Sequence, residues 1–269
     1  MVRFSGHGRS DVGHVRHHNE DSAFVAPGCL VVADGVGGAA AGEVASATAT
    51  YVVSASVLSD PTADPVALLR SAITQAQEQL REGVRRSPEL AGMATTLTAL
   101  VSDGQRCALA HVGDSRGYVL REGSLVRVTT DHTFVQQLVD DGALPEADRE
   151  SHPWRHMVLR SLNGDPLEHG DIVDLALVAG DRVLLASDGL TDLVSEPDIE
   201  RMLLRHHDRA AADALVNAAL AAGGRDNVTC VVASVLDDVP VSHDGLLLGA
   251  ARDPRIVVDP AAVRFSHTA

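Results

Sequence analysis

The stretch TTLTALVSDGQRCALAHVGDSRGYVLREGSLVRV, residues 95–128, decides the fold class of this chain. Its apolar runs follow one another closely, and turn-forming pairs such as Asp103-Gly104 and Glu122-Gly123 separate them, with no room for helices between. Strands this close in sequence must pair antiparallel, because a parallel return needs a crossover of about a dozen residues or more. A doubly wound nucleotide-binding fold is therefore excluded for this part of the chain.

Helical patterns flank this stretch on both sides. Apolar residues recur at three- and four-residue steps in 44–58 and 66–84 before it, and helices are again expected at 198–206 and 208–222 after it. Further apolar runs predict strands at 172–177, 183–186 and 228–235. We therefore predict an α+β fold, a four-layer α-β-β-α sandwich of two mostly antiparallel sheets flanked by helix pairs.

The predicted organisation is one domain followed by a tail. Residues 1–236 carry the strand and helix patterns, and the mixed, proline-containing segment at about 131–165 is interpreted as a surface flap. Residues 237–269 contain three prolines and no clear period. They are expected to form an extended C-terminal tail.

Charge and composition limit the partners of the chain. It has 37 acidic and 22 basic residues, a net charge of −15, and every basic residue is arginine. Nucleic acid and anionic membranes are disfavoured, because both are bound by positive fields. Without lysine there can be no lysine-based phosphate loop.

The cysteines and the apolar segments bear on location. Cys29, Cys107 and Cys230 each lie in or beside an apolar run, an arrangement that favours reduced, packed thiols in the cytoplasm. The longest uncharged stretch, 44–59, is shorter than the roughly 20 apolar residues of a membrane span. No membrane partner is expected.

Two distant segments share one design, an apolar run that ends on Asp-Gly. The run 30–33 ends at Asp34-Gly35, the run 183–187 ends at Asp188-Gly189, and Asp226 stands just before the run 228–235. A buried strand that ends in a carboxylate, followed by a glycine that permits close approach, can bring hard oxygen ligands together from distant parts of a sequence. The pattern predicts a divalent-cation site.

These aspartates belong to a larger ordered set of motifs. The set reads RHHNED at 16–21, ADGVGG at 33–38, GDSR at 113–116, ASDGL at 186–190 and GRDNVT at 224–229. With these motifs in this order, the chain resembles the metal-dependent protein phosphatase family (protein phosphatase 2C-like, PPM), in particular its compact bacterial members. The resemblance covers about residues 5–236, and we expect residues 1–236 to form the phosphatase domain.

The resemblance implies a site for two Mn²⁺ or Mg²⁺ ions. Asp34 would bridge the two ions, the Gly35 carbonyl would bind one of them, and Asp188 and Asp226 would bind the other. Glu20 would hold a metal-bound water. Oxygen-only ligands fit these ions and not zinc, which prefers histidine or cysteine.

The resemblance also implies roles around this pair of ions. Arg16 would grip the substrate phosphate through its planar guanidinium, and Arg16, Asp34, Asp188 and Asp226 would be the catalytic residues. Asp114 would help bind a third, weaker metal, together with Ser151 of the flap and Asp188. Asp21 is expected to be a supporting hydrogen-bond partner.

The expected reaction is hydrolysis of phosphoserine and phosphothreonine in proteins by direct attack of a water that bridges the two metals. The expected partners are phosphorylated proteins, substrates of bacterial serine/threonine kinases, and the chain is expected to be a monomer. Val36 stands where eukaryotic relatives commonly carry a histidine that protonates the leaving alcohol, so the general acid is unassigned. The scattered histidines, His156 among them, are interpreted as solvated or structural.

Two alternatives remain open at this point. One is a phosphatase of the same fold dedicated to a sigma-factor regulatory switch, although such proteins usually carry sensor domains. The other is a non-catalytic, phosphatase-like binding module. Such modules usually lose a metal carboxylate, and the motifs of this chain keep all of theirs.

Overall fold

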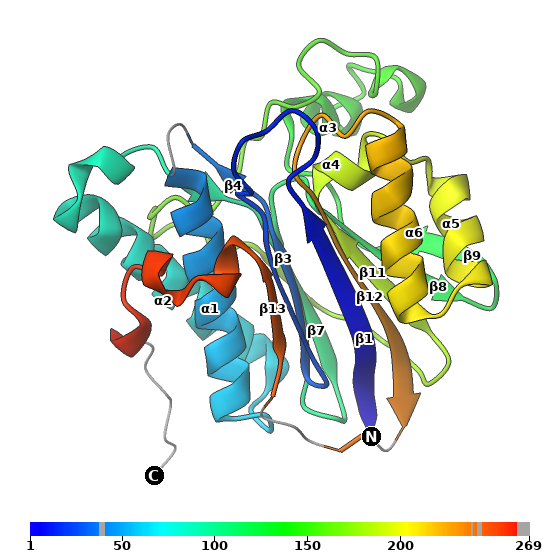
Figure 1. Cartoon of the computed structure of the whole chain (residues 1–269), viewed down its shortest axis with the longest axis horizontal. Coiled ribbons are helices and arrows are strands. Elements are labelled where there is room, and N and C mark those ends of the chain that lie inside the picture. The colour runs from blue at the N-terminus through cyan, green and yellow to red at the C-terminus, as the bar shows by residue number, and fades with distance from the viewer. Residues whose placement is uncertain (38–40, 238, 241–243, 263–269) are drawn as a thin grey trace.

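Two antiparallel sheets stacked on each other form the centre of the molecule (Figure 1). The structure is a computed structural model that describes residues 1–37, 41–237, 239–240 and 244–262. The first sheet has the order β1 (Val2–Asp11), β12 (Val228–Asp237), β11 (Arg182–Ala186), β8 (Arg116–Arg121) and β9 (Ser124–Arg127). The second has the order β10 (Asp171–Asp174), β7 (Cys107–Val112), β6 (Leu97–Ser102), β3 (Cys29–Ala33), β2 (Ser22–Ala26) and β13 (Leu246–Gly249). A short ladder pairs β4 (Gly35–Val36) with β5 (Ala94–Thr95).

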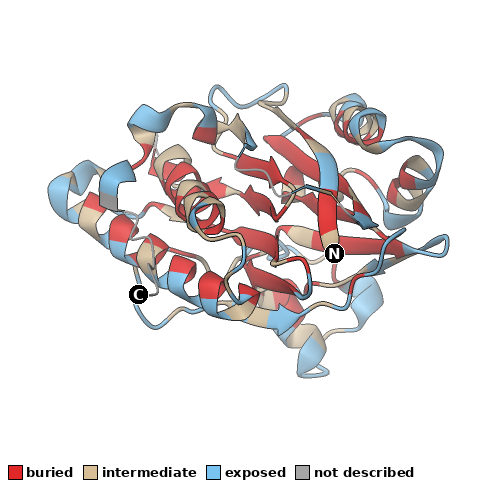
Figure 2. Ribbon diagram, turned by 90° about the horizontal axis from the view of Figure 1, so that it is seen from below, coloured by how far each residue is buried: buried red, intermediate tan, exposed pale blue. Residues whose placement is uncertain are grey.

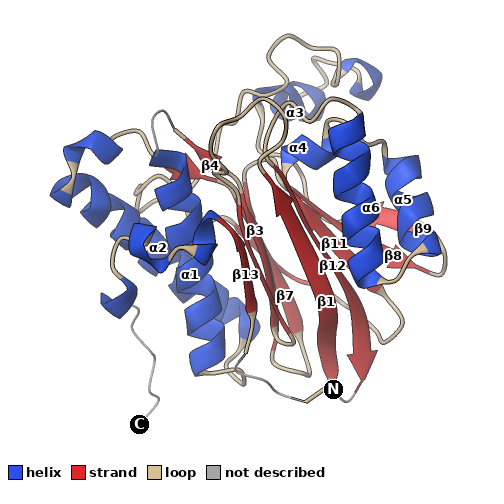
Figure 3. Ribbon diagram, in the orientation of Figure 1, coloured by secondary structure: helices blue, strands red, loops and turns tan. Residues whose placement is uncertain are grey.

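Helices cover the outer face of each sheet (Figure 3). The second sheet is covered by α1 (Ala41–Ser59) and α2 (Pro65–Arg86), and the first by α5 (Glu196–Arg205) and α6 (Asp208–Ala221). The short helices are α3 (Phe134–Asp140), α4 (Asp188–Thr191) and the 3₁₀ turns Pro88–Leu90, Glu146–Asp148, Ala250–Arg252, Pro254–Ile256 and Pro260–Ala262. The predicted four-layer sandwich is confirmed.

The core is built in three layers of apolar side chains. One layer lies between the two sheets and includes Phe4, Leu100 and Leu185. The other two lie under the helix pairs, one against α1 and α2 and one against α5 and α6. Burial therefore concentrates in the strands and on the inner helix faces, as Figure 2 shows. Strands such as β3 and β7 are buried at every residue, which explains their continuous apolar runs.

Local signals fix the helix boundaries. The Asp64 side chain accepts a hydrogen bond from the Ala67 backbone N–H at 2.9 Å, and Pro65 occupies the first helical position of α2. The Ser195 side chain caps α5 in the same way. Among the described helices, none has the length and apolar character needed to cross a membrane.

The C-terminal segment differs from the extended tail that the sequence predicted. Residues 246–249 form β13, which pairs antiparallel with β2 and so becomes the edge of the second sheet. The turns that follow pack on α1, where Ala251 and Val257 are buried. A four-residue strand has too few side chains to show a period, which is why the sequence pattern missed it. The remaining tail residues 238, 241–243 and 263–269 lie outside the described part.

Candidate metal centre

The strand pairing brings the predicted carboxylates to one end of the sandwich. Ala186 at the end of β11 pairs with Cys230 near the start of β12, so Asp188 and Asp226, just beyond these strands, lie at the same end. In the second sheet β3 and β7 both flank β6 and end on the same side, which brings Asp34 and Asp114 together there. The antiparallel fold therefore converts a dispersed motif into one cluster.

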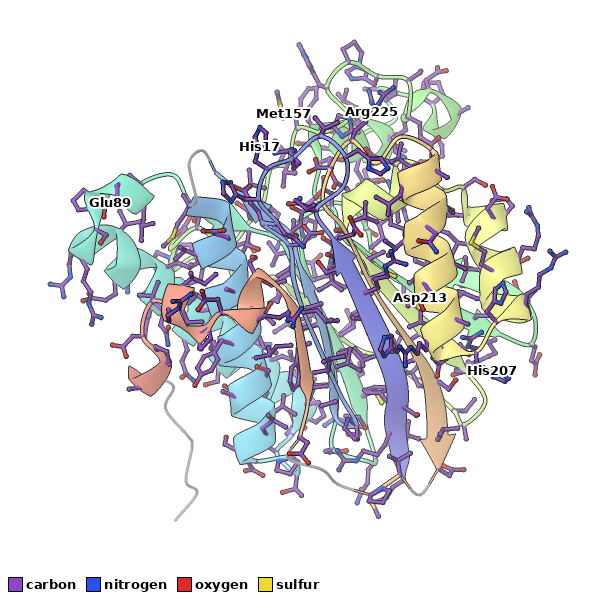
Figure 4. The ribbon with its side chains drawn as sticks, viewed as in Figure 1. His17, Glu89, Met157, His207, Asp213 and Arg225 are labelled. Atoms are coloured by element: carbon purple, nitrogen blue, oxygen red, sulfur yellow. The ribbon has the colours of Figure 1, made fainter. Side chains whose placement is uncertain are left out.

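A cleft of about 830 Å³ opens between the sheets at this end. The sequence-predicted residues that line it are Arg16, Glu20, Asp34, Gly35, Asp114, Asp188 and Asp226. Met157 of the flap and Arg225 also line it, and Figure 4 shows both, with His17, at the end where the connecting loops gather. Ser151 is not among the described lining residues. It is exposed, and its hydroxyl donates to the Asp148 carbonyl at 3.0 Å.

The two glycines of the Asp-Gly pairs allow neighbouring segments to pack closely. A Cβ on Gly35 would collide with the carbonyl of Gly42 in the first turn of α1, and a Cβ on Gly189 would collide with the carbonyl of Asn227. Each glycine thus lets another segment approach the backbone beside its aspartate. Gly38, the last residue of the motif at 33–38, lies outside the described residues.

The carboxylates of the cluster repel one another. Burial raises the pKa of Asp34 well above its usual range, and the charges of Asp21, Asp188 and Asp114 raise it further. Burial, then repulsion from Asp188, raises the pKa of Asp114 to about 8. The pKa of Asp188 rises to about 6, again chiefly because of burial and then because of Asp192 and Asp226. Such a group of half-buried acids is stabilised either by protons or by cations.

Hydrogen bonds hold the backbone around the cluster. The Asp34 N–H donates to Thr96 Oγ1 at 2.8 Å, and that hydroxyl is 2.8 Å from Ser115 Oγ. Asp21 accepts a hydrogen bond from Ser187 Oγ at 2.8 Å, which agrees with the supporting role predicted for it. Its second oxygen, Oδ1, is buried without a hydrogen-bond partner among the described residues.

Arg16 and Asn227 connect the two loops above the cleft. The Arg16 guanidinium donates to Asp226 Oδ2 at 2.8 Å while half of its side chain stays exposed. The Asn227 side chain accepts from the Glu20 N–H at 2.7 Å and donates to the carbonyls of Val12 and His18 at 3.0 and 2.9 Å. Asn227 therefore fixes the loop that carries Arg16 and Glu20, a role that sequence reasoning did not assign.

Asp192 and His156 are further residues that the sequence reasoning missed. Asp192 follows Asp188 by four residues, so the two lie on one side of a helical turn. His156 Nδ1 lies 3.3 Å from Asp192 Oδ2. One ligand atom from each of these three side chains lies within 4.8 Å of the others, a spacing that could hold a metal ion. The spacing of four residues was the available signal for Asp192, whereas only the folded flap places His156 here.

The oxygen donors present fit hard divalent cations. Asp34, Asp188 and Asp226 contribute carboxylates, Glu20 stands at the side, and the cleft carries an excess of negative charge. Mg²⁺ and Mn²⁺ prefer such oxygen donors, and their charge would relieve the repulsion described above.

Comparisons with known proteins identify the family of the chain. Residues 13–222 match the family model described as "Protein phosphatase 2C", so the chain belongs to the protein phosphatase 2C family. It is 44% identical over 229 residues to the serine/threonine protein phosphatase PstP of Mycobacterium tuberculosis. That match covers 85% of this chain but only 44% of PstP. It is also 34% identical over 239 residues to the serine/threonine phosphatase Stp of Listeria monocytogenes, covering 83% of this chain and 93% of Stp.

Solved structures show the same fold. The catalytic domain of PstP in complex with two manganese ions superposes with a TM-score of 0.82 at 40% identity, covering 88% of this chain and all of that domain. A PPM serine/threonine phosphatase from Mycobacterium smegmatis in complex with cacodylate gives a TM-score of 0.77 at 33% identity, and the match covers 86% of this chain and 97% of that one. The predicted family and fold class are therefore confirmed.

Proposed function

We propose that this protein is a metal-dependent serine/threonine protein phosphatase that hydrolyses phosphoserine and phosphothreonine. The observation that carries the proposal is the convergence of Asp34, Asp114, Asp188 and Asp226 on one cleft, where their mutual repulsion calls for cations. The names of the relatives support the same activity. The non-catalytic alternative is weakened, because the cleft retains every carboxylate that the motifs predicted.

Asp34, the Gly35 carbonyl, Asp188 and Asp226 are the proposed ligands of two Mn²⁺ or Mg²⁺ ions, with Glu20 acting through water. When bound, two such cations lower the pKa of a water between them and neutralise charge on a phosphoryl group. The proposal is supported by the two manganese ions in the PstP domain. Asp114 is the proposed ligand of a third ion, together with Asp188 and Asp192, whose charges both act on Asp114. His156 lies beside Asp188 and Asp192, whereas Ser151 is exposed and bonded to the Asp148 carbonyl.

The chain's own residues would bind and orient the substrate. Arg16 is half exposed and only one of its amino groups is committed to Asp226, so the guanidinium keeps donors for the phosphoryl oxygens. Asn227 holds the loop that carries Arg16. Val36 is half exposed at the cleft and cannot donate a proton, so the leaving alcohol must take its proton from another group.

Location and assembly remain predictions. We infer that the protein acts in the cytoplasm as a monomer, on phosphoproteins made by serine/threonine kinases. The location is supported by the free, buried thiols of Cys29, Cys107 and Cys230, which suit a reducing compartment.

The test is phosphate release from p-nitrophenyl phosphate and from a phosphothreonine peptide, measured with Mn²⁺ and with an excess of chelator. We expect release with Mn²⁺ on both substrates and its loss with chelator. A protein that releases no phosphate under either condition, although folded by circular dichroism, would contradict the proposed activity.

A further inference from the structure

A second pocket, of about 840 Å³, lies beside the catalytic cleft. We name it the arginine pocket, after Arg116, Arg127, Arg149 and Arg155, which line it. Its other walls come from the flap and from residues 191–197, between α4 and the start of α5. Arg155, Asp192 and Leu193 line both this pocket and the cleft. The two spaces are therefore neighbours with a common wall.

Three guanidinium groups surround one carboxylate in this pocket. Arg116 forms a bidentate pair with Asp131, with its closest nitrogen at 2.7 Å, while Arg149 and Arg127 have nitrogens 3.5 and 3.7 Å from Asp131 Oδ2. The side chains are mostly buried, with exposed fractions of 13% for Arg116, 21% for Arg127, 9% for Arg149 and 5% for Asp131. This buried layer therefore holds more positive than negative charge.

The exposed rim adds Arg155 and four carboxylates, those of Glu146, Glu150, Asp192 and Glu196, so the whole lining carries four arginines and five acids. The positive excess is therefore confined to the buried layer. Glu146 lies 3.2 Å from Arg149 Nε, but 63% of its side chain is exposed, so water screens the pair. Glu150 and Glu196 are exposed as well. An anion that enters the pocket would displace water from the guanidinium groups and form charge-assisted hydrogen bonds with them.

Two buried polar atoms of the pocket residues, Arg127 Nη1 and Thr191 Oγ1, lack hydrogen-bond partners among the described residues, although Arg127 Nη1 lies 3.7 Å from Asp131 Oδ2. A buried donor without an acceptor costs about 1–3 kcal/mol, and most such groups in proteins are satisfied. Oxygen atoms of a bound anion would supply the missing acceptors.

We propose that the arginine pocket binds a second phosphoryl group on the same substrate chain, a few residues from the phosphoserine or phosphothreonine in the cleft. This inference rests on the proposed phosphatase function and specifies its substrate class. The shared wall places both groups within reach of one extended peptide, which advances about 3.3 Å per residue. A phosphoryl dianion suits the pocket better than a carboxylate, because more than one arginine there lacks a buried counter-ion.

The test compares two peptides that differ at one position. Both carry one hydrolysable phosphothreonine, and the second peptide also carries a non-hydrolysable phosphonate analogue of phosphothreonine two to four residues away. We expect the phosphonate to raise kcat/KM by about tenfold, mainly through a lower KM, since charge-assisted hydrogen bonds are typically worth that much. Equal kcat/KM for the two peptides in the natural protein overturns the inference.

Substitutions in the arginine pocket test whether the preference for the phosphonate peptide arises there. Arg127→Gln and, separately, Arg149→Gln should bring the ratio of the two kcat/KM values close to one. Arg85→Gln is the matched control, because Arg85 is exposed on α2, pairs with Glu82 and lines neither space. It should keep the full ratio. A preference that survives in both pocket variants overturns the inference. Absence of activity on p-nitrophenyl phosphate in the natural protein would instead contradict the proposed function, so the two failures are distinguishable.

Discussion

The cleft and the arginine pocket are nearly equal in volume, about 830 and 840 Å³, and share a wall, but they handle buried charge in opposite ways. The cleft gathers carboxylates that repel one another. In the pocket, three guanidinium groups surround Asp131, so that the buried carboxylate is paired within the protein while arginine charge remains in excess. Like charges held together need an outside ion, whereas opposite charges stabilise the fold directly. The cleft should therefore govern activity, and the paired charges of the pocket should govern stability.

The largest expected effect is on the cleft. Asp188→Asn removes one carboxylate charge from the proposed metal centre, and we expect the Mn²⁺-dependent rate on p-nitrophenyl phosphate to fall by about 10³-fold or more. Asp141→Asn is the matched control, because Asp141 also precedes a glycine but is exposed and lies outside both spaces. A loss of less than about tenfold in Asp188→Asn would show that Asp188 is not a metal ligand.

The next effect concerns the stability provided by the pocket. Arg116→Met leaves Asp131 buried without its bidentate partner, and we expect the free energy of unfolding to fall by about 3 kcal/mol in urea titrations with Mn²⁺ present. Arg201→Met, which breaks an exposed pair with Asp198, should produce no measurable change. If the free energy of unfolding falls equally little in both variants, the buried pair of Arg116 and Asp131 does not stabilise the fold.

A smaller effect is expected at the mouth of the cleft. Arg16→Lys keeps the charge but loses the planar fork, so kcat/KM on a phosphothreonine peptide should fall by about 10- to 100-fold with no change in melting temperature. Arg9→Lys on β1 serves as the control, since Arg9 binds Asn217 and lies outside the cleft. An unchanged kcat/KM in Arg16→Lys would exclude a role for the guanidinium fork in binding phosphate.

The smallest effect is the pH dependence of the metal-free protein. The pKa values of Asp188, about 6, and Asp114, about 8, lie above that of an unfolded aspartate. Between the pKa of an unfolded aspartate and these raised values, the folded state therefore binds more protons than the unfolded state. Its free energy of unfolding should decrease as pH rises from about 5 to 8, by about 1 kcal/mol or more. Saturating Mn²⁺ should abolish this decrease. Chelator-treated protein that becomes more stable over the same range would contradict the shifted pKa values.

Sequence patterns predicted the features that follow from residues close together in the chain. The closely spaced turns in 95–128 sufficed to predict antiparallel sheets, and runs ending in Asp34-Gly35 and Asp188-Gly189 identified the carboxylates. Contacts that depend on the placed flap were harder to predict. Neither the approach of His156 to Asp192 nor the outward position of Ser151 follows from periodicity, because the flap has few buried side chains to fix its register.

The arginine pocket shows the same limit. Arg116 was part of a recognised motif, but its partner Asp131 lies 15 residues away, beyond a complete strand and turn. Nothing in local spacing indicates that Arg127 and Arg149 reach the same carboxylate. The pairing of β13 with β2 is equally remote in sequence, and it depends on which sheet edge is open once the sandwich has formed.

The pairing of β1 with β12 bears on how the molecule is made. Residues 2–11 pair along their whole length with residues 228–237, so β1 is synthesised more than two hundred residues before the strand that it pairs with. Contacts of such long range slow folding, and an unpaired strand edge invites aggregation in the meantime. The first sheet can therefore be completed only late in synthesis, and with it the end of the sandwich that carries the cleft.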